Sequence, residues 1–148
     1  MLTEIEIRPA VGADLALATD WLAGEGLPTE DLTTAHMDAF WLAIQDEQAV
    51  GMVGIEQFED IGLLRSLVVD KTCRGVGLGA QLVTALENKA RRTGLRELWL
   101  LTIDADAFFA RLGYLVMQRS DAPPAIQGTA EFSALCPGDA ALMCKHLV

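Results

Sequence analysis

The chain has 148 residues and a mass of 16.0 kDa, and 51% of its residues are hydrophobic, which suits one globular domain over residues 1–148 and leaves no room for a second. Its formal net charge of −10 argues against nucleic acid or an anionic membrane as a partner, because the summed field repels phosphates. No leader-like segment opens the chain and no apolar run approaches the ~20 residues of a membrane span, so we expect a cytoplasmic protein.

Three cysteines, Cys73, Cys136 and Cys144, are odd in number and lack a C-x-x-C spacing. A disulfide framework or a zinc site is therefore not expected. We predict free thiols that serve packing, and no bound metal.

The first half of the sequence predicts a helix followed by a run of strands. Alternation in EIEIRPA predicts a strand, and GADLALATDWLA has the period of an amphipathic helix that ends near Gly24. Gly, Pro, Thr and Asp residues then predict a loop or a broken helix. Three consecutive strands over residues 39–48, 49–60 and 61–70 form a predicted β-meander.

The second half alternates helices with strands. The best-marked helix has one apolar face, made of Leu78, Leu82, Val83, Leu86 and Ala90. It ends before Gly94, with arginines in its last turn. LRELWLLTI predicts a strand covered on both faces. Asp104 can cap a short helix that carries Phe108 and stops at Gly113, and strands are predicted over residues 114–120 and 140–147, with helical turns between them up to Leu135.

A glycine-rich segment, residues 73–80, precedes the long helix and satisfies two phosphate-binding patterns. Gly75 to Ala80 matches the dinucleotide pattern G-x-G-x-x-G/A, and Arg74 with Gly77 and Gly79 matches R-x-x-G-x-G. In both patterns backbone N–H groups at a helix N-terminus bind an anion, and glycine lets the ligand come close.

The position of this segment separates the two patterns. A dinucleotide fold places its glycines directly after the first strand of a βαβ unit, whereas the three meander strands come before this segment. Glu97 falls near a strand start and matches the ribose-binding acid poorly. A Walker loop is excluded because no Gly-Lys-Ser/Thr closes the segment. A tight turn that binds no ligand stays open as the alternative.

The sequence LVVDKTCRGVGLGAQLV resembles the coenzyme A pyrophosphate motif of the GNAT acetyltransferase superfamily, and AFFARLGY is similar to its A-x-x-F-Y-x-x-x-G-F/Y segment. The resemblance covers most of the chain. It implies a single GNAT-like domain of the α/β (α+β) class, with helices flanking a central, mixed but mostly antiparallel sheet. In that sheet the fourth and fifth strands splay apart, and the pantetheine of acetyl-CoA, the cosubstrate, lies between them.

The resemblance also assigns residues to the cosubstrate. It implies backbone contact near Leu67 and Val69 and pyrophosphate contact along the glycine-rich segment. The expected cosubstrate-binding residues are Leu67, Val69, Arg74, Gly75, Val76, Gly77, Leu78, Gly79, Ala80 and Phe109. A backbone N–H near Val68 or Val69 is expected to polarise the thioester carbonyl.

A narrower resemblance concerns three segments, GLLRSLVV, LLTIDADAFFARLGY and RSDAPPAIQGTAEFSALCP. They are similar to the arsenic-resistance-associated N-acetyltransferase-like branch. That branch implies an amino-acid-like acceptor, such as a glutamate mimic bearing an arsenic or phosphorus oxyacid, and a link to arsenic or oxyacid-antibiotic resistance.

Acetyl transfer requires a neutral amine, a polarised carbonyl and a thiolate that can leave. We predict that Glu56, on the third predicted strand of the sheet, relays the proton of the amine; the alternative is a solvent-facing glutamate. Arg65 and Ser66 interrupt an apolar strand, and Arg65 is expected either to bind an anionic acceptor group or to pair with an internal carboxylate. His36 lies in the region expected to cover the acceptor, where a solvated loop histidine is the alternative.

The superfamily often uses the tyrosine of the F-Y pair to protonate the departing thiolate, and here that pair is Phe108-Phe109. Tyr114 occupies a position that a core aromatic usually fills, so we predict that it is not the general acid. The predicted function is transfer of acetyl from acetyl-CoA to the amine of a small acceptor. A catalytically weak acyl-CoA-binding or regulatory domain is the alternative, and the superfamily favours a homodimer formed through the C-terminal strands.

Overall fold

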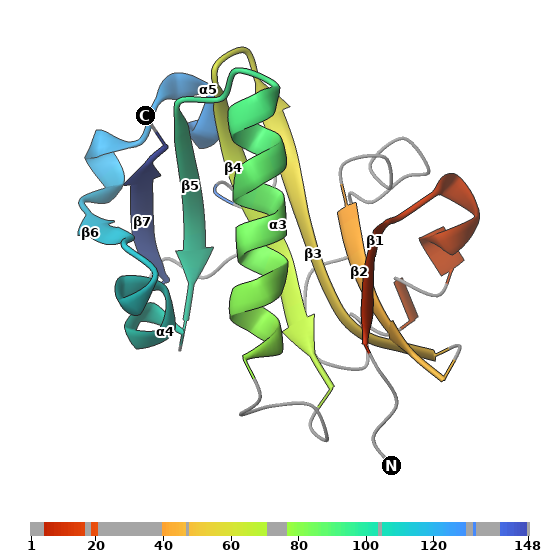
Figure 1. Ribbon diagram of the computed structural model, residues 1–148. Coiled ribbons are helices and arrows are strands. Elements are labelled where there is room, and N and C mark those ends of the chain that lie inside the picture. The colour runs from red at the N-terminus through yellow and green to blue at the C-terminus, as the bar shows by residue number, and fades with distance from the viewer. Residues whose placement is uncertain are drawn as a thin grey trace.

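A seven-stranded sheet organises the residues described by the computed structural model, which are 5–16, 19–20, 40–46, 48–70, 77–103, 105–129, 132 and 140–147. The strands lie in the order β1-β2-β3-β4-β5-β7-β6 (Figure 1). Their bounds are β1 Glu6–Pro9, β2 Phe40–Gln45, β3 Gln48–Phe58, β4 Ile61–Val69, β5 Glu97–Thr102, β6 Leu115–Met117 and β7 Ala141–His146. The helices are α3 Leu78–Arg92, α4 Asp106–Arg111 and α5 Pro124–Gln127, with 3-10 turns η1 Gly12–Asp14 and η3 Arg119–Asp121.

The sheet is mixed but mostly antiparallel, which confirms the predicted fold class. Only β4 and β5 pair in parallel, because α3 connects them as a crossover; all other neighbours are antiparallel. The predicted meander corresponds to β2, β3 and β4. The helix predicted after the glycine-rich segment is α3, and the strand predicted from LRELWLLTI is β5.

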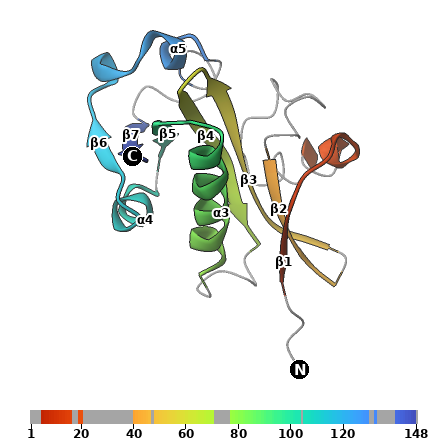
Figure 2. The same ribbon diagram turned by 45° about the horizontal axis from the view of Figure 1, so that its top comes forward.

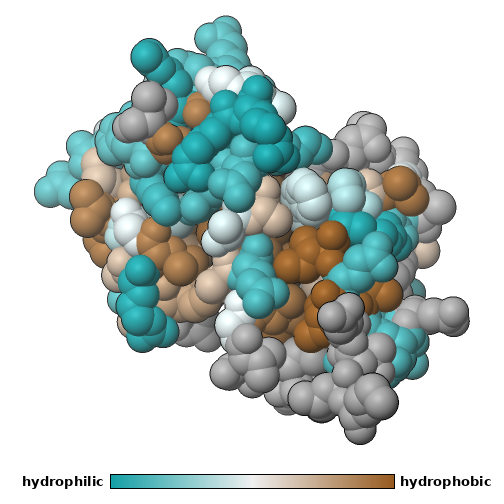
Figure 3. Space-filling model, in the orientation of Figure 1, coloured by the Kyte–Doolittle hydropathy of each residue, from teal (hydrophilic) through white to brown (hydrophobic). Residues whose placement is uncertain are grey.

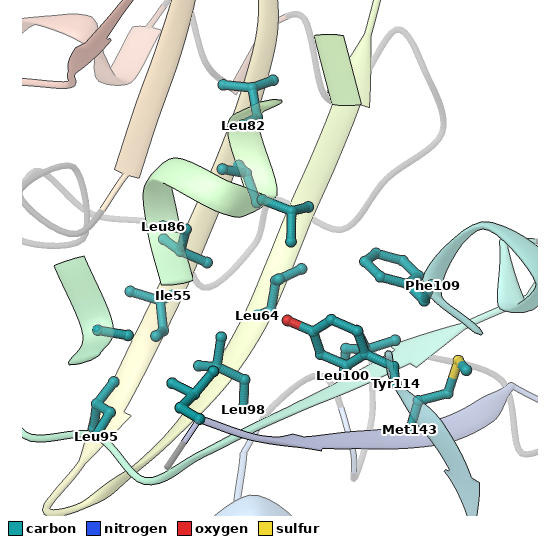
Figure 4. Packing of buried hydrophobic residues seen from close by; sticks show 14 of the residues in the cluster. Ile55, Leu64, Leu82, Leu86, Leu95, Leu98, Leu100, Phe109, Tyr114 and Met143 are labelled. Atoms are coloured by element: carbon teal, nitrogen blue, oxygen red, sulfur yellow. The ribbon is translucent and has the colours of Figure 1, made fainter. Parts of the chain in front are cut away.

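Helix α3 covers one face of the sheet, in front of β3 and β4, with β5 beside it (Figures 1 and 2). Its predicted apolar face is buried, since Leu78, Leu82, Val83, Leu86 and Ala90 are each at most 3% exposed. Gly51 on β3 allows this close approach, because an added Cβ would lie 2.8 Å from Cδ1 of Leu82. Figure 4 shows Leu82 and Leu86 packed over Ile55 and Leu64, the centre of the main core. The helix ends at Arg92 with Thr93 as its C-cap, and Gly94, whose φ is +91°, follows the cap as predicted.

The opposite face of the sheet carries two smaller apolar clusters. One contains Phe40, Leu42, Met52 and Val68, and the other contains Leu63, Trp99, Ile126 and Leu142, which α5 helps to cover. The sheet is therefore buried on both faces around β4 and β5, as the almost continuous apolar sequence of β5 predicts.

Gly54 lies under the Phe40 ring, and an added Cβ would come within 2.2–2.5 Å of three ring carbons. We expect Gly54→Ala to lower the free energy of unfolding by about 1–3 kcal/mol, because overpacking forces a fully buried ring to shift. Urea unfolding measures this loss. Gly128→Ala is the control, since its Cβ would meet only carbonyl oxygens at 3.6–3.7 Å. Equal stability of the two variants would contradict the packing account.

Two predicted elements differ in extent from those observed. The strand predicted over residues 114–120 stops at Met117, and the chain turns into η3. Asp121 causes this turn, because its Oδ2 accepts the Gln118 backbone N–H at 3.2 Å and closes the segment on itself. The helix predicted over residues 12–23 begins as the 3-10 turn η1, in which the Asp14 carboxylate accepts the Val11 N–H at 2.8 Å. Residues 15, 16, 19 and 20, which follow this turn, are α-helical, so the described part of the segment confirms the helix after an irregular start. Local hydrogen bonds of this kind compete with regular elements at their ends.

Candidate functional site

Strands β4 and β5 pair only at their first residues, Ile61 with Glu97, Gly62 with Leu98 and Leu63 with Trp99. Beyond these pairs, residues 64–69 of β4 and 100–102 of β5 separate, and we call this region the β4–β5 divergence. Figure 1 shows the two strands spreading toward their C-terminal ends. The predicted splay is confirmed. It leaves the second half of β4 with no β5 neighbour, so its backbone can hydrogen-bond an extended ligand there.

A β-bulge interrupts β4 within this divergence. Gly54 pairs with Arg65 and Met52 with Val68, so three steps along β4 match two along β3. The extra residue is Ser66, which has a φ of +60°. A left-handed serine costs roughly 1–2 kcal/mol, so the surrounding pairs must hold it in place. The bulge turns the backbone of Ser66 and Leu67 out of the regular ladder, at the strand where carbonyl polarisation is predicted.

Helix α3 begins at the end where β4 and β5 have separated. Gly77 is its N-cap with a φ of +81°, and an added Cβ would meet no atom within 4 Å. The first N–H groups of a helix lack intrahelical partners and carry the positive end of its dipole. Gly77 itself therefore presents no side chain to an anion at the helix end, and this geometry fits the pyrophosphate of acetyl-CoA.

The predicted cosubstrate residues divide into two groups. Leu67, Val69, Gly77, Leu78, Gly79 and Ala80 lie on the divergence or the first turn of α3, so the fold brings them to one end of the sheet. Arg74, Gly75 and Val76 lie outside the described residues, as does His36. The binding roles of both groups stay predictions.

Phe108 and Phe109, on α4, face different surroundings. Phe109 is 4% exposed and belongs to the main core. Phe108 lies against the start of α3, because a Cβ on Gly79 would be 3.2 Å from its Cζ and 3.7 Å from Cγ2 of Val69. The cosubstrate contact predicted for Phe109 stays a prediction; in the structure Phe109 packs in the core, and Phe108, which the sequence analysis does not assign to the cosubstrate, is the ring nearer to the first turn of α3. Neighbouring residues on a helix point about 100° apart, so a motif does not show which of the two rings reaches the divergence.

Arg65 and Glu56 form an ion pair on the face of the sheet opposite α3. Nη1 of Arg65 donates to Oε1 of Glu56 at 2.6 Å, and the side chains are 0% and 14% exposed. Nε of Arg65 donates to the Ser66 hydroxyl at 3.2 Å. Arg65 therefore has the internal carboxylate partner that the sequence left open, and Glu56 is the member of the pair that reaches the surface.

Both residues lie where the divergence begins. Glu56 stands opposite Leu63, the last residue of β4 that pairs with β5, and Arg65 is two residues further along β4. Oε2 of Glu56 accepts no hydrogen bond within the described part of the chain. The carboxylate thus has one oxygen fixed by Arg65 and one oxygen able to accept a proton or an ammonium hydrogen bond.

Tyr114 is only 1% exposed, and its hydroxyl donates to Oε2 of Glu87 at 2.9 Å. Burial, aided by the Glu87 charge, raises the pKa of the Tyr114 hydroxyl well above its usual range. A buried phenol already bound to a carboxylate is a poor proton donor to a ligand in the divergence. This geometry agrees with the prediction that Tyr114 is not the general acid.

Figure 3 shows the face of the molecule that carries α3. Its upper part is hydrophilic, and apolar side chains reach the surface in the lower half of the view, toward the end where α3 begins. Among the described residues, no helix is long and apolar enough to cross a membrane. Nor does any group of three His, Cys, Asp or Glu side chains form a metal site in that part of the chain.

Comparison with known proteins identifies the family of the chain. The model of the acetyltransferase (GNAT) family matches residues 13–114. An uncharacterised N-acetyltransferase of Chlorobaculum tepidum is 28% identical over 123 residues, which cover 80% of this chain and 79% of that one. The amino-acid acetyltransferase of Mycobacterium tuberculosis is 31% identical over 101 residues, which cover 64% of this chain and 58% of the relative.

Solved structures share the fold. The N-acetylglutamate synthase of Neisseria gonorrhoeae, in complex with coenzyme A and N-acetyl-glutamate, has a TM-score of 0.81 at 19% identity; all of this chain aligns with 36% of that chain. A Mycobacterium tuberculosis protein in complex with coenzyme A also has a TM-score of 0.81, at 23% identity over 97% of this chain and 99% of that chain. The family match agrees with the divergence of β4 and β5 and with the glycine N-cap of α3. The chain therefore belongs to the acetyltransferase (GNAT) family of N-acetyltransferases.

Proposed function

We propose that the protein transfers the acetyl group of acetyl-CoA to the amine of a small, amino-acid-like acceptor. The observation that carries the proposal is the β4–β5 divergence with the N-terminus of α3 at its open end. The similarity to the amino-acid acetyltransferase of Mycobacterium tuberculosis supports the acceptor class. So does the fold shared with the synthase solved with N-acetyl-glutamate, although this chain spans about a third of its length.

The proposed cosubstrate site runs from α3 into the divergence. Acetyl-CoA supplies an acetyl group activated as a thioester. N–H groups at Gly77 to Ala80, with Arg74 to Val76, hold the pyrophosphate. Backbone groups of Leu67 and Val69 hold the extended arm, and an N–H near Val68 or Val69 polarises the carbonyl, since the bulge at Ser66 turns the strand there.

The proposed acceptor site lies on the other face, at the Arg65–Glu56 pair. Arg65 fixes Oε1 of Glu56, and Oε2 receives the proton of the acceptor ammonium, directly or through water. Arg65 then acts through Glu56. The second arrangement is direct binding of an acceptor carboxylate by Arg65, helped by Ser66 and by His36, whose part in acceptor binding stays a prediction from the sequence.

Departure of the thiolate uses no tyrosine in this proposal. Phe109 stands where the superfamily often has that tyrosine, and the Tyr114 hydroxyl is bound to Glu87. A thiol with a pKa of about 8.5 leaves readily, so water or a weak donor is sufficient. The lack of a tyrosine at position 109 also favours the second candidate function, a catalytically weak acyl-CoA-binding or regulatory domain.

Two finer features belong to the proposal. The link to arsenic or oxyacid-antibiotic resistance rests on sequence resemblance to that branch. The homodimer would form along the edge strand β6, where Leu115 and Val116 are 67% and 65% exposed. Location in the cytoplasm stays an expectation.

A panel of acceptors tests the proposed function. We expect wild-type protein to release free thiol from acetyl-CoA with amino acids, or with amino-acid mimics that bear an arsenic or phosphorus oxyacid, at kcat/KM at least about tenfold above simple amines and polyamines. Calorimetry with acetyl-CoA runs in parallel. Binding without turnover for any acceptor would establish the regulatory alternative, and no binding would refute both.

A further inference from the structure

A buried polar cluster of Glu87, Tyr114 and Lys145 joins α3 to β7 and has no part in the chemistry proposed above. Glu87 is 5% exposed, and both its oxygens lie 3.1 Å from Nζ of Lys145, while Oε2 also accepts the Tyr114 hydroxyl. Nζ of Lys145 donates to the Leu112 carbonyl as well, at 2.8 Å. The cluster therefore ties three segments together: α3, the turn after α4, and the C-terminal strand.

Stability alone is a weak reason for such a cluster. Burying a carboxylate and an ammonium costs several kcal/mol in desolvation, and apolar residues of similar volume often do as well. Glu87 interrupts the apolar face of α3 between Val83 and Ala90, where a leucine would pack. A polar cluster with all its hydrogen bonds formed selects one geometry more strictly than apolar packing does, because each hydrogen bond has a preferred length and direction.

Aromatic contacts lead from this cluster to the β4–β5 divergence. The Tyr114 ring meets Phe109 edge to face at 5.4 Å between centroids, and Phe109 meets Phe108 in the same way at 5.0 Å. Figure 4 shows Tyr114 and Phe109 beside each other at the edge of the main core. Phe108 in turn lies against Gly79, close to Val69. The last ring of the series thus lies against the first turn of α3.

We propose that Glu87, Tyr114 and Lys145 are positioning residues that set where Phe108 lies relative to Gly79 and Val69. The inference rests on the proposed function. If acetyl-CoA binds in the divergence, the distance from Phe108 to Gly79 and Val69 sets the width available to its extended arm. The three polar residues touch neither acetyl-CoA nor acceptor. They act through the Phe109 and Phe108 rings.

Tyr114→Phe tests the proposal, because it removes one hydroxyl and keeps the ring. We expect the Kd and KM for acetyl-CoA to rise about fivefold to tenfold, while kcat at saturating acetyl-CoA changes by less than about twofold. Thr129→Val is the matched control. It also removes a buried hydroxyl, which donates to the Ile126 carbonyl at 2.7 Å near α5, and it should lower the melting temperature without changing either constant.

A double-mutant cycle with Phe108→Leu decides whether Tyr114 acts through the rings. We expect the double variant to bind acetyl-CoA no more weakly than Phe108→Leu alone, because the ring that transmits the effect is already gone. Additive losses, or an unchanged Kd in Tyr114→Phe, would overturn the proposal while leaving the proposed function intact. If the wild type itself does not bind acetyl-CoA, the proposed function fails and this inference fails with it.

Discussion

A Gly77→Glu variant is expected to weaken acetyl-CoA binding by about a hundredfold or more. The new side chain enters open space, so the loss does not come from a clash. Instead its carboxylate lies at the N-terminus of α3, where it takes up the N–H donors and repels the pyrophosphate. Calorimetry with acetyl-CoA measures the loss, and circular dichroism shows whether the helix is retained.

Gly94→Glu is the matched control for backbone strain. Gly94 also has a positive φ, +91° against +81° for Gly77, and an added Cβ there would also meet nothing within 4 Å. It lies at the other end of α3, so the variant should have a similar conformational cost, of about 1–2 kcal/mol, with normal binding. Gly77→Ala separates strain from charge at the site itself. Equal weakening by all three substitutions would show that α3 stability, not an anion site, controls binding.

The sequence predicts the long-range layout well because its signals are local and repeated. The apolar residues of α3 recur with the helical period, and the strands around it are separated by clear turns, so the sequence alone predicts both the helix and the strands. Alternation and periodicity do not reveal the splay of β4 from β5. That prediction depends on the resemblance of the glycine-rich segment to a known motif.

The details of the site follow from one irregular residue. Ser66 takes a left-handed conformation that serine rarely adopts, and nothing in LLRSLVV signals it. The bulge shifts the register of β4 by one residue, so that Arg65 and Val68 lie on the same face although three positions separate them. Simple alternation therefore assigns the residues of β4 beyond Ser66 to the wrong faces.

The Glu87 cluster shows a different limit of sequence reasoning. Glu87 falls four residues after Val83, on the apolar face of α3, but as a charged residue it was not among the residues predicted to form that face. Its partners Tyr114 and Lys145 lie 27 and 58 residues away in the sequence. Only the tertiary fold brings them within hydrogen-bond distance.

Glu56→Gln is expected to lower kcat by about a hundredfold or more with every acceptor, because the amide keeps the shape of the carboxylate but cannot take a proton. The Kd for acetyl-CoA should not change, since Glu56 lies on the face opposite α3. Steady-state assays with saturating acetyl-CoA measure the effect. Glu97→Gln is the control: Glu97 is also a partly exposed strand glutamate, paired with His146 at 3.4 Å, and its loss should leave turnover unchanged.

Arg65→Met then separates the two roles open to the arginine. If Arg65 acts by holding Oε1 of Glu56, turnover falls by the same factor for amino acids and for simple amines, and its effect is absent in the Glu56→Gln background. If Arg65 binds the acceptor directly, the loss is confined to acceptors with a carboxylate or oxyacid and amounts to about 2–3 kcal/mol, the range of a charge-assisted hydrogen bond. The 0% exposure of the Arg65 side chain favours the first result, because a buried guanidinium reaches Glu56 but not a ligand in solvent. Removing it also leaves Glu56 unpaired, so a stability loss of up to about 3–5 kcal/mol accompanies the change and must be measured by urea unfolding on the same preparation.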